Sequence, residues 1–208
     1  MVVASTDVED LPGRAPRPSG PRAEAREQAI LDAALELIME VGYDRLSMDA
    51  LAERAHAGKA TIYRRWTGKA QVVAEAIRRR KSEHEVDPDT GSLRGDLLGA
   101  LGHTCTSLTL DEAIVSGVMS AMRTDPELAA LMRAQVINAD GKFDSIVERA
   151  VGRGELPPGT TAGPINEVGP AVVMMRLAFR GEPLDDAFTT HLVDDILLPI
   201  LQPPGKTT

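Results

Sequence analysis

Hydrophobic residues recur along this chain mainly at intervals of three and four positions, the spacing that places side chains on one face of an α-helix. The first such stretch covers residues 23–41 and stops at Gly42, a residue type that commonly follows a helix C-terminus. Two short stretches follow near 47–55 and 59–66, and a third covers 69–81. The pattern therefore predicts four helices in the first 81 residues.

The remainder of the chain repeats the same period after an interruption at Asp87–Gly91, which we take as a domain boundary. Asp125, Pro126 and Glu127 are typical of a helix start, with a capping acid, a proline in the first turn and an acid behind it. We expect helices near residues 93–108, 110–123, 126–151, 163–180 and 184–201.

The last two predicted helices carry apolar residues on more than one face. A helix that is apolar over most of its surface must be buried on two sides. In a chain of 208 residues this favours a homodimer in which helices 163–180 and 184–201 of each subunit form a four-helix bundle.

Composition supports an all-α protein. Hydrophobic residues make up 43% of the chain, enough for a sizeable core, whereas aromatic residues make up only 3% and runs of alternating β-branched residues are few. The single cysteine, Cys105, excludes an intramolecular disulfide. No apolar run reaches the length needed to span a bilayer, and the acidic, proline-rich N-terminus is unlike a signal peptide, so we expect a cytoplasmic protein without membrane function.

Residues 46–69 have the layout of a helix-turn-helix, the motif that places its second helix in the major groove of DNA. Ser47 can cap the first helix, and His56 to Gly58 form the turn. In the second helix, Ile62 and Trp66 lie four positions apart and are expected to face the interior. This leaves several polar side chains for DNA, namely Lys59, Thr61, Tyr63, Arg64 and Arg65.

The motif resembles that of the TetR family of bacterial transcriptional regulators. The resemblance is carried by Ala52, Ala55, Lys59, Thr61, Tyr63, Trp66 and Lys69, and it covers roughly residues 26–73. Two positions depart from the family pattern: His56 stands where glycine is usual, and Gly58 stands where serine is usual. His tolerates a left-handed backbone better than branched residues do, and glycine is an acceptable N-cap without a side-chain acceptor.

The resemblance implies an N-terminal three-helix DNA-binding domain and a larger C-terminal helical domain for dimerisation and effector binding. It assigns Tyr63, Thr61, Lys59 and Lys69 mainly to the phosphate backbone. Base reading is expected from Lys59, Ala60 and the neighbouring turn, with Arg64 or Arg65 as helpers. The complete set of candidate DNA-binding residues is Ser47, Lys59, Ala60, Thr61, Tyr63, Arg64, Arg65 and Lys69.

Charge is divided unevenly along the chain. The net charge is −8, but residues 14–81 carry 14 Lys and Arg against 9 Asp and Glu, a local charge of +5. Phosphate attraction is screened over about 8–10 Å at physiological salt, so this local charge matters more for DNA than the total does. We accordingly expect a disordered basic and proline-rich arm at 1–21, a DNA-binding domain at 22–81 that includes a linking helix at 69–81, and an effector and dimerisation domain at 92–202.

A small apolar or amphipathic effector is expected in the C-terminal domain. Its candidate lining consists of Cys105, Val118, Met119, Met122, Phe143, Met174, Met175 and Phe179, although Met or Phe at helical spacing is more often ordinary core. By resemblance, effector binding would release a repressor dimer from a palindromic operator in double-stranded DNA.

Two alternatives remain open at this point. The C-terminal domain could serve only for dimerisation or for a protein partner, or it could be a helical enzyme. The sequence offers no phosphate-binding loop, no paired-cysteine metal spacing and no nucleophile elbow, so we expect no cofactor, no metal and no catalytic activity. His103 and His191 on predicted helices are more often structural than ligating.

Overall fold

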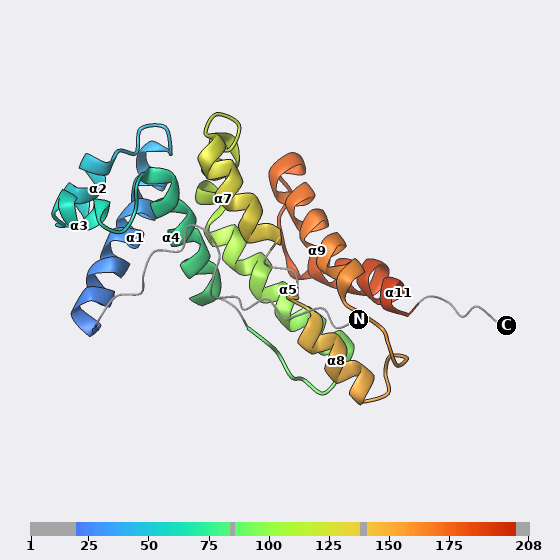
Figure 1. Cartoon of the computed structure of the whole chain (residues 1–208). Coiled ribbons are helices and arrows are strands. Elements are labelled where there is room, and N and C mark those ends of the chain that lie inside the picture. The colour runs from blue at the N-terminus through green and yellow to red at the C-terminus, as the bar shows by residue number, and fades with distance from the viewer. Residues whose placement is uncertain (1–19, 84–85, 138–140, 203–208) are drawn as a thin grey trace. The chain divides into compact units, whose positions relative to one another are not determined.

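The computed structural model describes residues 20–83, 86–137 and 141–202. The expected N-terminal arm therefore lies outside the described residues, except for its last two positions. Every regular element in the described ranges is helical, which confirms the all-α prediction. Figure 1 labels most of these helices.

Contacts divide the chain into two compact units, which do not follow chain order strictly. Among the described residues, unit 1 contains 20–77 together with 121–131, and unit 2 contains 78–83, 86–120, 132–137 and 141–202. The division falls inside α4 (Lys69–Glu83) and inside α7 (Pro126–Ile137). In α4 it lies after residue 77, ten positions before the boundary expected at Asp87. A segment in the middle of the chain thus belongs to the N-terminal unit.

Unit 1 is built on α1, a long amphipathic helix whose apolar stripe packs against three shorter helices. Its core includes Leu31, Leu37, Leu51, Ile62 and Val73, all 6% exposed or less. Gly42 ends α1 at a positive φ of 78°, as the sequence predicts. The helices are α1 (Pro21–Val41), α2 (Met48–Arg54), α3 (Lys59–Tyr63) and the first part of α4 (Lys69–Glu83).

Unit 2 surrounds one apolar cluster to which α5, α8 and the last helices all contribute. Its elements are α5 (Leu93–Leu110), α6 (Glu112–Ala121), the end of α7 (Pro126–Ile137), α8 (Asp144–Gly152), α9 (Gly163–Met175), a π-helical turn at Arg176–Arg180, α10 (Asp186–His191), a π-helical turn at Leu192–Leu197 and α11 (Leu198–Leu201). Figure 1 shows α8 beside the N-terminal half of α5, in agreement with their contacts.

The single helix predicted over 126–151 is wrong, because the structure has two helices there, α7 and α8. Gly141 adopts a φ of +114°, which is incompatible with a continuing helix. Phe143 follows, fully buried, and its backbone N–H donates to Asn166 Oδ1 of α9 at 3.0 Å. The break is thus fixed by a partner that is distant in sequence.

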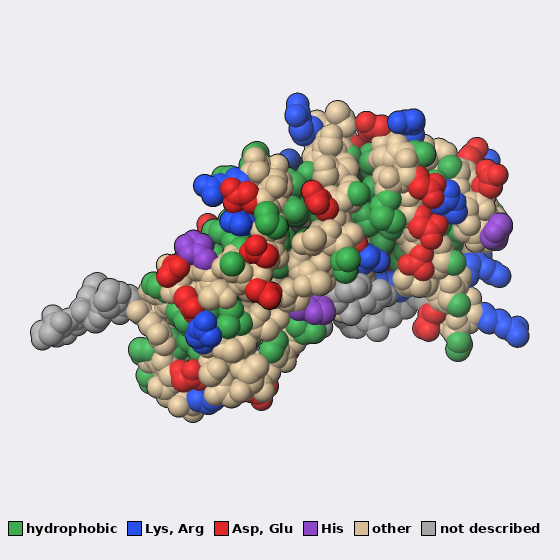
Figure 2. Space-filling view, turned by 180° about the vertical axis from the view of Figure 1, so that it is seen from behind, with side chains coloured by type: hydrophobic (Ala, Val, Ile, Leu, Met, Phe, Trp, Pro, Cys, Tyr) green, Lys and Arg blue, Asp and Glu red, His purple; other side chains and the backbone are tan. Residues whose placement is uncertain are grey.

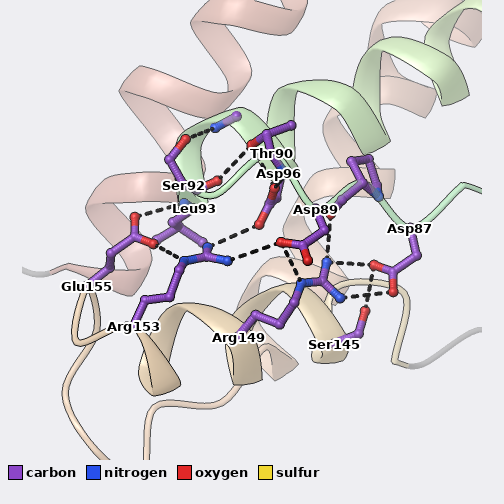
Figure 3. Close-up of polar contacts among 12 residues, drawn as sticks. Asp87, Asp89, Thr90, Ser92, Leu93, Asp96, Ser145, Arg149, Arg153 and Glu155 are labelled. Carbon is purple, nitrogen blue, oxygen red and sulfur yellow. Dashed lines mark hydrogen bonds and ion pairs between the residues drawn. The ribbon is translucent and has the colours of Figure 1, made fainter.

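A segment that we call the strap, residues 87–92, lies against α5 and α8 (Figure 3). Arg149 donates to both carboxylate oxygens of Asp87, at 2.8 and 2.9 Å, and to the Pro88 carbonyl at 2.7 Å. The strap also approaches the α5 backbone closely, since a Cβ built on Gly99 would lie 2.9 Å from Pro88 Cγ. The close approach at Gly99 of α5 and the hydrogen bonds from Arg149 of α8 therefore hold this connection in place.

Asp96, in the first turn of α5, is the buried acceptor of the strap. Its side chain is fully buried and accepts from the Thr90 N–H at 2.6 Å, the Thr90 hydroxyl at 2.7 Å and Arg153 at 3.1 Å. Burial raises the pKa of this carboxyl, but the hydrogen bonds from Thr90 and Arg153 outweigh burial and leave the pKa below its ordinary value. Asp96 is therefore a charged, fully partnered group inside unit 2.

Candidate nucleic-acid interface

The turn between α2 and α3 has the geometry that the sequence predicts. Ser47 caps α2, its hydroxyl accepting from the Ala50 N–H at 3.1 Å. His56 adopts a φ of 48°, in the left-handed region that lets the chain reverse between the helices. Gly58 then precedes α3 without a side-chain cap. The departures of His56 and Gly58 from the family pattern are accordingly compatible with the turn.

The short helix α3 rests on two buried side chains and exposes most of its polar ones. Ile62 is 0% and Trp66 2% exposed, so the side that faces the core agrees with prediction. Tyr63 is 51% exposed, and Lys59, Ala60 and Arg64 are also exposed. Thr61 is half-buried and Ser47 is exposed. These six residues present an ammonium, a guanidinium and three hydroxyls on or beside one short helix.

Arg65 differs from these six residues because its side chain is engaged within unit 1, and its expected help in base reading stays a prediction. Its guanidinium donates to Glu27 Oε1 of α1 at 2.7 Å, and its side chain is only 16% exposed. The Glu27 side chain is 2% exposed, so its carboxylate needs a partner inside the unit. The Arg65 guanidinium also lies 5.5 Å from the Trp66 ring centroid. Arg65 therefore connects the segment that follows α3 to α1.

Lys69, at the start of α4, is likewise occupied within unit 1. Its ammonium donates to the carbonyls of Tyr43 and Asp44, at 3.0 and 3.3 Å, and lies 4.3 Å from the centroid of the Tyr43 ring. Phosphate contact by this side chain would have to compete with these interactions. The phosphate role that the resemblance implies stays a prediction.

Tyr43 connects the turn after α1 with the segment 121–131 of the same unit. Its ring is 3% exposed, and its hydroxyl donates to Asp125 Oδ2 at 2.5 Å. Burial raises the pKa of the Tyr43 hydroxyl, and Asp125 raises it further. Asp125 also accepts from the Leu128 N–H at 3.0 Å and so caps α7, as its sequence position indicates.

Asp49, in the first turn of α2, is not among the candidate DNA-binding residues expected from the sequence. Its carboxylate lies 2.7 Å from the Lys59 ammonium, across the gap between the first turns of α2 and α3. The hydrogen bond to Asp49 raises the pKa of Lys59. A spacing of ten residues carries no recognisable signal for such a pair, so only the folded turn brings the two side chains together.

The candidate effector residues divide into buried and exposed groups. Cys105, Val118 and Phe143 are 4% exposed or less, and Met174 is half-buried. Burial raises the pKa of the Cys105 thiol, which disfavours the reactive thiolate. Cys105 and Phe143 belong to the apolar cluster of unit 2, as ordinary core residues also would.

The other candidates do not belong to that cluster. Met119 is 36%, Met175 54% and Phe179 76% exposed in the single chain, and their role in an effector pocket stays a prediction. Met122 lies in unit 1 rather than unit 2. Hydrophobic periodicity does not distinguish a side chain that faces a cavity from one that faces solvent or a partner.

The remaining candidate chemistry is sparse. His191 is exposed and lies 2.6 Å from Asp195 on the next turn, and His103 is half-buried on α5. In the part of the chain that the structure describes, His, Cys, Asp and Glu side chains nowhere gather in threes that could hold a metal ion. A membrane-crossing segment would need a longer and more apolar helix than any in the described ranges.

A three-helix unit with a left-handed turn and a short, polar second helix defines the class of helix-turn-helix DNA-binding proteins. Comparison with known families agrees with this class. The family described as "Bacterial regulatory proteins, tetR family" matches residues 30–76, and the "Tetracyclin repressor-like, C-terminal domain" matches residues 87–196. The chain belongs to the TetR family, and it is a DNA-binding transcriptional regulator.

Individual relatives give the same result. The chain is 38% identical to the DNA-binding transcriptional repressor TetR of Mycobacteroides abscessus, over 89% of this chain and 98% of that protein. It is 33% identical to an uncharacterised HTH-type regulator of Mycobacterium bovis, over 97% and 98% of the two chains. Among solved structures, the TetR family regulator SCO0332 is similar with a TM-score of 0.63 and 26% identity, covering 83% of this chain and 96% of that one. A SmeT–triclosan complex shares the fold, with a TM-score of 0.60 and 22% identity over 85% and 91% of the two chains.

Proposed function

We propose that this protein is a homodimeric repressor that binds a palindromic operator and is released by a small apolar or amphipathic effector. The observation that carries the proposal is the surface of α3. Lys59, Ala60, Tyr63 and Arg64 are exposed there, while Ile62 and Trp66 anchor the helix in the core. Such a helix can enter a major groove without unpacking its unit.

Dimerisation is supported by apolar side chains that the single chain leaves exposed. Phe179 and Met175, near the end of the α9 segment, are 76% and 54% exposed, whereas Val173 of the same helix is 2% exposed. Large exposed apolar residues on a helix with a second, buried apolar side are typical of a subunit interface. In a two-fold dimer, two copies of α3 would meet successive major grooves about 34–36 Å apart, which accounts for a palindromic site.

Effector release is supported by the composition of unit 2 and by the fold neighbour SmeT, whose structure is a complex with triclosan. The interior around Cys105 and Phe143 is apolar, so an apolar or amphipathic molecule suits it best. An effector acts only through its different affinities for the DNA-binding and the released states. Thermal-shift screening with apolar metabolites tests this part of the proposal.

The DNA-binding part is tested by selecting bound fragments from a random duplex pool and then measuring the affinity of the enriched sequence against salt. We expect a palindromic sequence whose affinity falls steeply as salt rises. The variant Tyr63→Ala should weaken binding to the operator and to random duplex by a similar factor of about tenfold or more, because it removes a hydrogen bond to a charged phosphate.

Met39→Ala is the matched control for this variant. Met39 lies on α1 of the same unit and is 52% exposed, close to the 51% of Tyr63. We expect no change in DNA affinity for Met39→Ala. Unchanged operator affinity in Tyr63→Ala at fixed salt would refute the role of α3.

A further inference from the structure

An acidic side chain stands on the surface that the proposed function assigns to DNA. Asp49, in the first turn of α2, contacts Lys59, the first residue of α3, at 2.7 Å. Both side chains are well exposed, at 70% and 59% respectively. On the face drawn in Figure 2, acidic and basic side chains are likewise interspersed.

Helix electrostatics explain why these two residues pair. The N-terminus of a helix is its positive end, so Asp49 is favoured in the first turn of α2 whereas Lys59 is disfavoured in the first turn of α3. Gly58 supplies no side-chain acceptor to the N-terminus of α3. The carboxylate of Asp49 therefore compensates a charge that α3 itself does not favour, and it restricts where the Lys59 ammonium can lie.

The pair also changes what Lys59 can do on DNA. An ammonium has three donors, so Lys59 can keep its hydrogen bond to Asp49 while it donates to an acceptor such as guanine O6 or N7. On random DNA, where no base acceptor is correctly placed, the attraction of Lys59 for phosphate is offset by the repulsion of Asp49. The carboxylate should thus weaken binding to random DNA more than binding to the operator.

We propose that Asp49 is a specificity-determining residue, which positions Lys59 for base reading and suppresses its use as a phosphate contact. This inference rests on the proposed function, since it assumes that α3 reads DNA. Asp49 acts through Lys59, so it is a positioning residue. A favourable interaction with the dipole of α2 alone would give Asp49 no influence on the ratio of the two affinities.

The test is a double-mutant cycle with the full-length protein. Affinity for the selected operator and for random duplex is measured against salt for the wild type, Asp49→Asn, Lys59→Met and the double variant. We expect Asp49→Asn to bind random duplex several-fold more tightly, with a smaller gain on the operator. Its salt dependence on random duplex should be steeper by about one phosphate contact. In the Lys59→Met background, Asp49→Asn should leave the ratio of the affinities unchanged.

Two controls separate positioning from general charge. Asp32→Asn removes the same charge from α1 of the same unit, where Asp32 accepts from Gln28 at 2.9 Å, and it should not change the ratio. Asp49→Glu keeps a carboxylate at the site and should restore most of the specificity that Asp49→Asn loses. Circular dichroism and thermal unfolding of each variant show whether α2 and α3 remain folded.

The outcomes are distinguishable. An unchanged ratio in Asp49→Asn, or the same change in the Lys59→Met background, would overturn the inference while leaving the DNA-binding proposal intact. If Asp49→Asn and Asp32→Asn changed the ratio of operator affinity to random-duplex affinity equally, the inference would also be overturned. The loss of one negative charge anywhere on the unit would then explain the change in the ratio. A wild-type protein without salt-dependent DNA binding would refute the proposed function itself.

Discussion

Replacing Gly95 by alanine should destabilise unit 2, although the same change usually stabilises a helix. Alanine is favoured over glycine in a helix interior by about 0.8–1.0 kcal/mol. A Cβ at position 95, however, would lie only 2.2 Å from the Thr90 hydroxyl oxygen and 2.8 Å from the Ser92 hydroxyl oxygen. The side chains of Thr90 and Ser92 would have to move, and the hydrogen bond from the Thr90 hydroxyl to the buried Asp96 would be lost.

The size of the effect follows from these contacts. Overpacking a well-filled site costs about 1–3 kcal/mol, and a hydrogen bond to a charged group contributes about 1.5–3 kcal/mol. Subtracting the gain in helix propensity of about 1 kcal/mol leaves a net destabilisation of about 1.5–5 kcal/mol. The loss should appear in the unfolding of unit 2.

Gly102→Ala is the matched control, because Gly102 lies on the same helix and a Cβ there would meet nothing within 4 Å. We expect this variant to be more stable than the wild type by up to about 1 kcal/mol. Urea unfolding followed by circular dichroism measures both, at one protein concentration, since the stability of a dimer depends on concentration. If Gly95→Ala proved as stabilising as Gly102→Ala, the close packing of the strap on α5 would be refuted.

Two further predictions concern buried charges. Arg65→Met should destabilise unit 1 by about 3–5 kcal/mol, because it leaves the Glu27 carboxylate buried without its cation. Adding Glu27→Gln should recover part of that loss, and a double variant no more stable than Arg65→Met would contradict the pairing. Arg153→Met should lower the free energy of unfolding at pH 7. Because the pKa of Asp96 is depressed in the folded protein, the stabilisation is present above the unfolded pKa of about 3.9 and is lost as the pH falls through the folded value. The difference in the free energy of unfolding between wild type and Arg153→Met should therefore become smaller below about pH 4. A difference that does not depend on pH would refute the role of Arg153 as a partner of ionised Asp96.

The features predicted correctly from sequence are those set by neighbouring residues. The cap at Ser47, the turn at His56 and the buried pair Ile62 and Trp66 all depend on spacings of a few positions, which the helix period makes visible. The family pattern added the expectation of DNA binding. Local rules were sufficient for α1 to α4 because each of these helices has a recognisable start or stop.

The features missed are those set by distant partners. The break between α7 and α8 depends on Asn166, which lies 23 residues beyond Phe143. The hydrogen bond that engages Arg65 within unit 1 depends on Glu27, which lies 38 residues before it. Phe179 was assigned to a pocket because the hydrophobic pattern shows only that the residue is apolar. The pattern does not show which part of the protein or of a partner contacts its side chain. Such positions require the folded chain.

The membership of residues 121–131 in unit 1 has a practical consequence for dividing this protein. A fragment that ends after α4 retains the four helices read from the sequence but lacks Asp125, the acceptor for the Tyr43 hydroxyl. It would expose the Tyr43 ring, which is 3% exposed in the whole chain, and it would lack Leu128, which is 0% exposed there. A chimera that transplants this DNA-binding unit onto another effector domain therefore needs three junctions, near residues 77, 121 and 131, and a single cut after the linking helix would transfer an incomplete unit.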